Sequence, residues 1–191
     1  MVVATQIKLM TLEEYLNYDN GTDTLCELVN GELIPMPPES HQNQQVSISL
    51  LVYFSQLGIP PQLLRNQIAI SVMGGRSTAR IPDLTVLSED LARELSETNR
   101  SIILSDMPPP TLVVEVVSPN QDKRDYRYKR SEYAARQIPE YWIVDPILDK
   151  VTILELVEGL YEEQVYTAAQ IIRSPQFSQF NLTAQQVLTG P

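Results

Sequence analysis

The chain has 191 residues, 43% of them hydrophobic and 20% charged, the composition of an ordinary globular protein large enough for a sizeable core. A formal net charge of −10 disfavours non-specific nucleic-acid binding by the bulk of the surface. No stretch approaches about 18 consecutive apolar residues, so we expect no membrane-spanning helix and no membrane partner. The single cysteine, Cys26, excludes an internal disulfide and a cysteine-based zinc site, and without a signal-like N-terminus we expect a cytoplasmic protein.

Local signals in the first half of the chain predict two helices, a hairpin and two further strands. Thr11 and Glu14 form a capping-box pattern that opens a short helix, and Asn30-Gly31 is a strong signal for a tight hairpin turn. A longer helix begins near His41, and apolar alternation marks the later strands. The expected ranges are helix 11–18, hairpin strands 25–29 and 32–36, helix 41–57, and strands 63–72 and 81–87.

The second half of the chain predicts further strands and helices. The expected ranges are helix 88–95, strand 112–117, helix 121–136, strand 141–144, hairpin strands 151–157 and 160–166, and helix 183–188. The strand, helix and strand between residues 112 and 145 imply a crossover inside a mixed sheet with flanking helices, an α/β or α+β architecture. Because no repeat, linker or low-complexity segment interrupts the chain, we expect a single domain over residues 1–191.

One carboxylate stands out because it occupies an apolar strand. Glu115 lies in the middle of the run 112–117, where an ionised acid is costly unless a cation or several donors compensate it. A second acid, Asp83, occupies another apolar segment, and a basic helix that carries Lys129 follows Glu115 closely. Two acids on strands and a nearby lysine are the groups needed to hold a divalent metal against a phosphodiester.

The predicted basic helix carries residues three or four positions apart, which puts them on one helical face. Lys129 on that face is expected to point toward the sheet, with Asp125 and Tyr133 beside it. Basic residues are concentrated between positions 123 and 136, so one local face could be positive despite the net charge. From charge alone, a solvated face balanced by neighbouring acids is the simpler interpretation. The candidate DNA contacts on this face are Lys123, Arg127 and Arg130.

A combined pattern runs through several segments of the chain. Its parts are Arg80-Ile81-Pro82-Asp83, Val114 to Pro119, the trio of Asp125, Lys129 and Tyr133, and Pro139 to Pro146. Together they resemble the Uma-two family of restriction-type endonucleases, which belongs to the PD-(D/E)xK nuclease superfamily. The segment Cys26 to Leu33 and the later His41 also resemble this family, and the resemblance spans about residues 10–160.

The resemblance implies a restriction-endonuclease-like fold and an endonuclease that hydrolyses DNA with Mg²⁺, for which Mn²⁺ would substitute. On it, Asp83 and Glu115 are the metal ligands, and Glu27 is a further acidic ligand. The superfamily lysine stands two residues after the second acid, where this chain has Val117, so Lys129 takes that role by position. The metal would activate a water, and Lys129 would orient it or stabilise developing charge.

The remaining residues of the pattern have supporting roles on this resemblance. Asp125 holds Lys129 in place, and Tyr133 packs against or donates to the same network. Gln137 stands where relatives tend to carry glycine, a departure that concerns the helix end and not the chemistry. His41 is the only histidine, which excludes a histidine triad, and we interpret it as a helix-start residue in preference to a general base.

Two interpretations from other classes compete with an endonuclease. A module that keeps the nuclease fold but cleaves nothing could bind nucleic acid or a protein partner, and the acidic charge and Val117 favour it. A structural or oligomerisation domain would instead pair Glu115 with a buried lysine or arginine. A homodimer would present two sites to a DNA duplex, but no residue pattern identifies one.

Overall fold

The computed structural model of the chain describes residues 9–19, 21–22, 24–72, 76–98, 101–119 and 124–190. Its helices are α1 (Leu12–Leu16), α2 (His41–Gln56), α3 (Glu89–Thr98), α4 (Arg130–Ala135) and α5 (Ala184–Thr189). Its strands are β1 (Cys26–Val29), β2 (Glu32–Pro35), β3 (Leu64–Arg65), β4 (Ala69–Val72), β5 (Thr78–Arg80), β6 (Leu84–Val86), β7 (Ile102–Ile103), β8 (Leu112–Val116), β9 (Glu140–Asp145), β10 (Lys150–Val157) and β11 (Leu160–Thr167). None of the described helices combines the length and the apolar character needed to cross a membrane.

The strands form two mixed sheets, which confirms the expected combination of mixed β-structure and flanking helices. The first sheet has five strands in the order β2-β1-β5-β4-β7, and the second has six in the order β11-β10-β9-β8-β6-β3. In the second sheet, β8 and β9 are parallel, and the helical segment between them supplies the crossover that a parallel pair requires.

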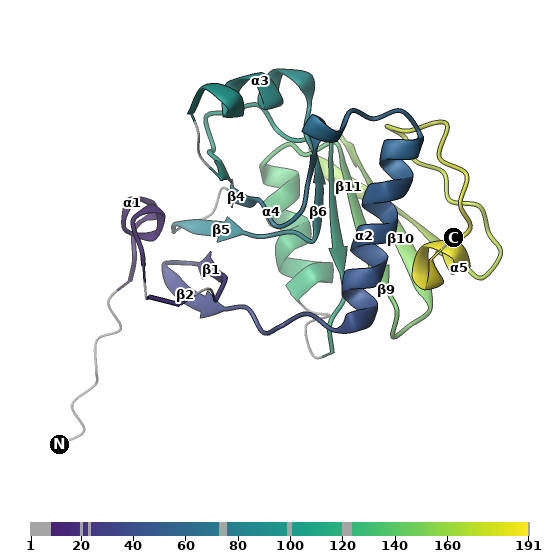
Figure 1. Ribbon diagram of the computed structural model, residues 1–191, viewed down its shortest axis with the longest axis horizontal. Coiled ribbons are helices and arrows are strands. Elements are labelled where there is room, and N and C mark those ends of the chain that lie inside the picture. Colours follow the sequence, from purple (N-terminus) through teal and green to yellow (C-terminus); the bar gives the residue numbers. More distant parts are fainter. Residues whose placement is uncertain are drawn as a thin grey trace.

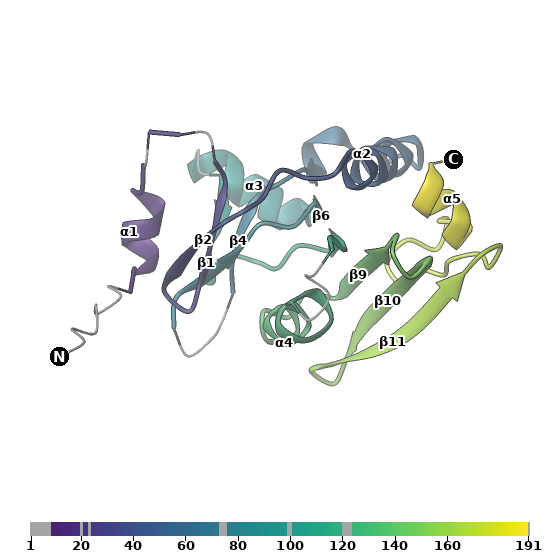
Figure 2. The ribbon, with the colours of Figure 1, turned by 90° about the horizontal axis from the view of Figure 1, so that it is seen from below.

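The second sheet is covered by helices on both faces. Helices α2 and α5 pack on one face and α4 packs on the other, as Figures 1 and 2 show. Alternate residues of β8 divide between these layers, with Val114 in the cluster that includes α2 and α5, and Val113 in the cluster that includes α4. Because side chains alternate along a strand, Glu115 shares the face of Val113 and is directed toward α4 and the first sheet.

The expected hairpin and helix starts are confirmed, and each follows from local chemistry. Asn30 and Gly31 both have positive φ, 53° and 85°, as the tight turn between β1 and β2 requires. Thr11 caps α1 through the predicted box with Glu14. His41 begins α2, directly after its capping residue Ser40.

The expected strand over residues 63–72 is wrong as a single element. It divides into β3, which pairs with β6 in the second sheet, and β4, which pairs with β5 in the first. Gln67, in the turn between them, has a φ of 55°, which a continuous strand does not allow. Apolar residues flank the polar run Arg65-Asn66-Gln67 on both sides, because the short strands before and after it are largely buried. The break coincides with this polar run, which the expected single strand passed over.

Three further differences concern strand and helix limits. The expected strand 81–87 is shorter, because β6 begins at Leu84 and leaves Pro82 and Asp83 in the connection from β5. The two short strands β5 and β7 were not predicted. Within the described residues the helix expected over 121–136 begins with a π-helical segment, Arg124–Lys129, and only then becomes α4. The candidate DNA contact Lys123 lies outside the described residues.

Candidate functional site

The two sheets meet where the chain passes from one to the other. Residues 81–83 connect β5 of the first sheet with β6 of the second, and residues 66–68 connect β3 with β4. Asp83 ends the first of these connections, directly before the Leu84 that pairs with Val114 of β8. This pairing brings Asp83 beside Glu115, so both predicted acids lie at the junction of the sheets.

Asp83 and Glu115 line one small cavity of about 30 Å³, enough for a single water-sized group. Asp125 and Lys129 line the same cavity from the π-helical segment, and Glu39 lines it from the loop between β2 and α2. The other lining residues are Met36, Pro37, Val116, Ser118 and Arg124. Glu39, Asp83, Glu115 and Asp125 are far apart in the sequence, so only the folded chain unites them.

Lys129 is buried at the centre of these acids, with 1% of its surface exposed. Its Nζ lies 2.6 Å from Glu115 Oε2, 3.2 Å from Asp125 Oδ1 and 3.7 Å from Glu27 Oε1. Burial by itself lowers the pKa of Lys129, but the three carboxylates outweigh it and raise the pKa. The ammonium group therefore stays charged at neutral pH.

Tyr133 and Asp125 occupy the positions that their helical spacing predicts. The Tyr133 hydroxyl donates a hydrogen bond to Glu115 Oε1 at 2.6 Å, and burial followed by the nearby Glu115 raises the pKa of Tyr133. Asp125 is 2% exposed, and its Oδ1 faces Lys129 without a well-directed hydrogen bond. The π-helical segment and α4 thus deliver Lys129 and Tyr133 to the carboxyl group of Glu115, and Asp125 to Lys129.

Glu27 lies outside the cavity lining and supports the site from the first sheet. It is fully buried on β1, which lies between β2 and β5 and is not an edge strand. Glu27 Oε2 is 3.0 Å from Arg80, and Oε1 accepts a hydrogen bond of 3.2 Å from the Ile81 backbone. Burial opposes ionisation, but Lys129 and the neighbouring arginines outweigh it and lower the pKa of Glu27.

Asp83 and Glu115 have the opposite protonation tendency. Burial, followed by the charge of Glu115, raises the pKa of Asp83 well above its usual value, although the Val116 backbone donates to Asp83 Oδ2 at 2.5 Å. Burial also raises the pKa of Glu115 to about 7, with Lys129 opposing the shift and Asp125 adding to it. Two buried acids that resist ionisation beside each other are typical of a functional site.

Acids outnumber cations around the cavity. Among the described residues here, four buried acids face two buried cations: Glu27, Asp83, Glu115 and Asp125 against Arg80 and Lys129. Counting the half-buried charged groups that the structure describes here adds two acids, Glu39 and Glu132, and one cation, Arg124, so acids remain in excess. Protons on Asp83 and Glu115 would compensate part of the excess, and a divalent cation would compensate it as well.

The donor set suits a hard divalent cation only in part. Carboxylate oxygens are the ligands that Mg²⁺ prefers, and Mg²⁺ is often held by one or two carboxylates together with waters and substrate oxygens. Asp83 and Glu115 meet that description. Over the part of the chain that the structure describes, no group of three or more His, Cys, Asp or Glu side chains is arranged to hold a metal ion by itself. The residues therefore fit an open site and not a closed cage.

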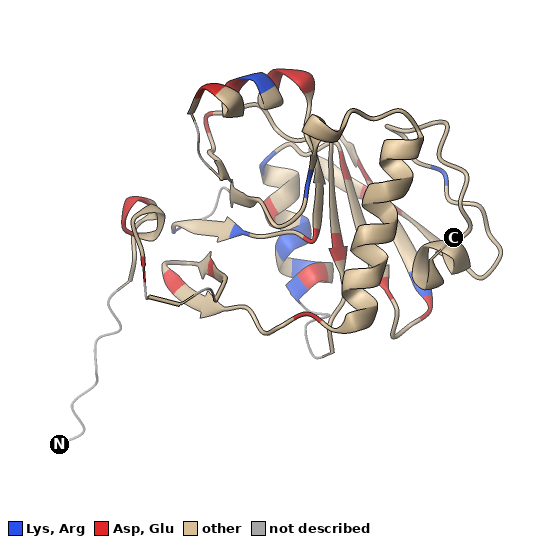
Figure 3. Cartoon of the chain, viewed as in Figure 1, with Lys and Arg blue, Asp and Glu red and all other residues tan. Residues whose placement is uncertain are grey.

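The predicted basic face is only partly free. Arg127 is exposed, and its guanidinium lies over the Tyr128 ring. Arg130 instead pairs with Glu163 and donates to the Tyr161 carbonyl. Figure 3 shows acidic and basic residues side by side along the helical segment that contains α4. His41 is exposed and does not line the cavity.

Three residues of the site were missed in the sequence. Arg80 is 1% exposed and binds Glu27 and Glu132 together, yet its only sequence signal is its place in the Arg80-Ile81-Pro82-Asp83 segment. Glu39 follows two prolines, and Gln67 donates a 3.0 Å hydrogen bond to it. Glu115 was identified because it is a carboxylate within an apolar strand. Glu39 lies in a loop and Gln67 is uncharged, so neither carries that signal.

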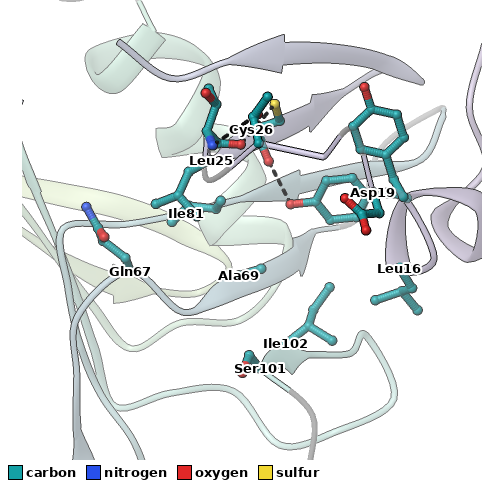
Figure 4. A pocket seen from close by; sticks show the side chains of 13 residues that line it. Leu16, Asp19, Leu25, Cys26, Gln67, Ala69, Ile81, Ser101 and Ile102 are labelled. Atoms are coloured by element: carbon teal, nitrogen blue, oxygen red, sulfur yellow. Dashed lines mark hydrogen bonds between the residues drawn. The ribbon is translucent and has the colours of Figure 1, made fainter. Parts of the chain in front are cut away.

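A larger pocket lies apart from these acids. It has a volume of about 350 Å³ and is lined mainly by residues of α1, the segment before β1 and the first sheet, with Gln67 at one end (Figure 4). The Tyr15 hydroxyl beside it donates to the Cys26 carbonyl at 2.8 Å. Asp83, Glu115 and Lys129 do not line this pocket, so the chemistry-bearing residues and the larger pocket are separate.

Comparisons with known proteins identify the fold and the family. The fold is similar to that in the crystal structure of "a putative nuclease belonging to DUF820 from Anabaena variabilis ATCC 29413", with a TM-score of 0.75 and 18% sequence identity over 94% of this chain and 97% of that one. No curated protein matches the chain significantly. The model of the Uma2 family, described as "Putative restriction endonuclease", matches residues 12–185. The chain therefore belongs to the Uma2 family.

Proposed function

We propose that this chain is a nuclease that hydrolyses DNA phosphodiester bonds with the help of Mg²⁺. The family description and the nuclease with a similar fold support the reaction class. The observation that carries the proposal is the cavity where Asp83 and Glu115 lie beside the charged Lys129, with acids in excess of cations around it. A structural core would be expected to balance its buried charges.

The proposal gives each group a chemical role. Asp83 and Glu115 would hold the metal, which when bound supplies a coordinated water of lowered pKa and offsets charge on the phosphate. Lys129 keeps its proton, so it orients the attacking water or neutralises developing negative charge and does not act as a base. Tyr133 fixes the Glu115 carboxyl group through its hydrogen bond, and Asp125 holds Lys129.

Glu27 has a different role in this proposal. Because Arg80 and the Ile81 backbone engage its two oxygens, Glu27 is better suited to positioning Lys129 and Arg80 than to binding a metal. Arg80 extends this support to α4 through its hydrogen bonds to Glu132, at 2.7 and 2.8 Å. Glu27 and Arg80 therefore tie the first sheet to the helical segment that carries Lys129.

A second candidate is a nuclease-fold module that binds nucleic acid or a protein without cleaving it. The contact that favours it is the 2.6 Å ion pair between Lys129 and Glu115, which already gives the buried Glu115 a partner without any metal. The net charge of −10 also opposes tight binding of DNA over most of the surface.

Calorimetric titration with Mn²⁺ and a plasmid-cleavage assay separate the two candidates. The variants are Asp83→Ala and Glu115→Ala, with Asp90→Ala on the exposed face of α3 as a matched acid control. We expect saturable Mn²⁺ binding and cleavage in the wild type and in Asp90→Ala, and loss of both in the two site variants.

Each other outcome has a definite meaning. Mn²⁺ binding without cleavage of any nucleic acid would favour the inactive module. Absence of Mn²⁺ binding in the wild type would contradict the metal-dependent nuclease and leave Glu115 as a structural ion-pair residue. Cleavage by Glu115→Gln at the wild-type rate would also contradict the proposed mechanism, since that variant removes the charge while keeping the shape.

A further inference from the structure

The turn between β3 and β4 contains a backbone conformation that needs an explanation. Gln67 has a φ of 55°, in the left-handed region that side chains other than glycine rarely adopt. Such residues persist where the surrounding structure holds them, and they cluster at functional sites. Gln67 is half-buried, and it lies in one of the two connections between the sheets.

The side chains of this turn reach two of the segments that deliver acids to the cavity, those of Glu39 and Asp83. The side-chain amide nitrogen of Gln67, Nε2, donates a hydrogen bond to Glu39 Oε1 at 3.0 Å. The amide group of Gln67 is therefore oriented with its NH₂ toward the acceptor oxygen of Glu39. Next to it, Asn66 Nδ2 donates to the backbone carbonyl of Asp83 at 2.9 Å. One turn thus contacts a side chain that lines the cavity and the backbone of the predicted ligand.

Both neighbouring segments restrain the backbone of Glu39, and Gln67 restrains its side chain. Pro37 and Pro38 fix the backbone before it, and Ser40, directly after it, caps α2. Glu39 lines the same cavity as Asp83 and Glu115, and Glu39 contributes to the raised pKa of Asp83, after burial and the charge of Glu115. Gln67 engages one oxygen of Glu39, so the Glu39 carboxyl group is fixed in the lining of the cavity that it shares with Asp83.

We propose that Gln67 and Glu39 are positioning residues for Asp83, with Gln67 acting through Glu39. This inference rests on the proposed function for its meaning, because it concerns how the first predicted metal ligand is oriented. Partners that hold a metal ligand typically change affinity or activity by about 10- to 100-fold when they are removed. The strained turn is then the conformation that brings the Gln67 amide to Glu39.

The chain offers a matched control for this proposal. Gln137 also has a positive φ, 61°, but its side chain bonds only to the Ala134 carbonyl of its own helix. Gln67→Gly and Gln137→Gly therefore make the same chemical change at the same kind of backbone position. Both remove a glutamine side chain and relieve a left-handed residue, so neither is expected to lower the thermal midpoint through backbone strain.

The first readout needs no metal and no activity. The ¹³C chemical shift of the Asp83 side-chain carboxyl is measured in metal-free protein at one pH. We expect it to move in Gln67→Gly and in Glu39→Ala, and to stay at the wild-type value in Gln137→Gly. An unchanged signal in Gln67→Gly would overturn the proposal whether or not the protein is a nuclease.

The second readout is Mn²⁺ affinity by calorimetry, with kcat and KM measured on the same variants. We expect Gln67→Gly to weaken Mn²⁺ binding roughly 10-fold and to lower kcat more than it raises KM, while Gln137→Gly matches the wild type. The double variant Gln67→Gly/Glu39→Ala should be no worse than Glu39→Ala, because Gln67 acts through Glu39. Additive losses of Mn²⁺ affinity in the double variant, or equal Mn²⁺ affinity in Gln67→Gly and the wild type, would refute the proposal that Gln67 acts through Glu39. If the wild type binds no Mn²⁺, the proposed function fails and the carboxyl signal alone decides the positioning.

Discussion

Lys129 shows how a single side chain is stabilised in a place where solvent cannot reach it. Carboxylates of Glu115, Asp125 and Glu27 surround its ammonium group and replace the water that burial removes. A buried cation of this kind is stable only while its partners remain, and the partners depend on the cation in turn. The same residue therefore affects both folding and the proposed reaction.

Replacing Lys129 with methionine should destabilise the protein by about 3–5 kcal/mol, because it leaves buried carboxylates without their cation. Urea unfolding measures this loss of free energy. The double variant Lys129→Met/Glu115→Gln should lose less, because it removes one of the uncompensated charges as well. Equal losses in the single and double variants would show that the Lys129–Glu115 pair does not determine the effect. No cleavage is expected from either variant.

The π-helical segment and α4 form the element that carries the site's helical side chains. Its buried side presents Asp125, Lys129 and Tyr133 to Glu115, and its outer side carries the exposed Arg127. Single turns of π-helix are frequent at functional sites. One element therefore holds the interior ion pairs and also carries an exposed cation on its outer side.

Arg127 provides the test of this outer side. If the element contacts DNA, Arg127→Glu should weaken DNA binding. The slope of log affinity against log salt concentration should become shallower by about 1, because one phosphate contact is lost. The unfolding midpoint should not change. Fluorescence anisotropy at several salt concentrations measures both quantities. Arg93→Glu on α3 is the control, since Arg93 is equally basic and its side chain is 68% exposed. Unchanged binding in Arg127→Glu would remove this element from the DNA footprint.

At the scale of the whole molecule, the described residues buried between the two sheets carry more acidic than basic side chains. Connections 66–68 and 81–83 join the sheets beside the cavity, so repulsion among the acids acts directly against the closure of the sheets. Protons relieve the repulsion at low pH, and a divalent cation would relieve it at higher pH. Global stability should therefore depend on pH and on metal together.

Metal-free protein should lose stability as the pH rises from 4.5 to about 7. The pKa of Glu115 is raised from 4.5 to about 7 in the folded state, so the folded protein holds a proton that the unfolded chain releases. The contribution of this proton to the free energy of unfolding is fully present below pH 4.5 and is lost as the pH rises through 7. The loss of unfolding free energy is on the order of 3 kcal/mol. Thermal unfolding against pH measures it, and Glu115→Gln should give a flatter profile.

Metal addition supplies the complementary measurement. Mn²⁺ should raise the unfolding midpoint more at pH 8 than at pH 5.5, because ligand carboxylates must release their protons to bind it. Equal stabilisation at both pH values would show that Asp83 and Glu115 are not the groups that bind the metal.

Local chemistry determined much of this protein from the sequence. The Asn30-Gly31 turn, the Thr11 cap and the start of α2 each depend on neighbouring residues, and they form as predicted. Glu115 could be identified because a carboxylate in an apolar strand is costly wherever that strand lies. The family also followed from residues visible in the sequence. The single domain, the cytoplasmic location and the homodimer remain predictions.

Only the tertiary structure decided which distant groups meet. The polar run Arg65-Asn66-Gln67 marks the break within residues 63–72, but it does not show that the two parts join different sheets, which depends on their pairing with β6 and β5. Arg80 meets Glu27 across 53 positions, and Gln67 meets Glu39 across 28. The charge state of Lys129 depends on carboxylates from three separate elements. Spacing along the chain determines which residues share a face, but the energy of a buried charge depends on everything packed around it.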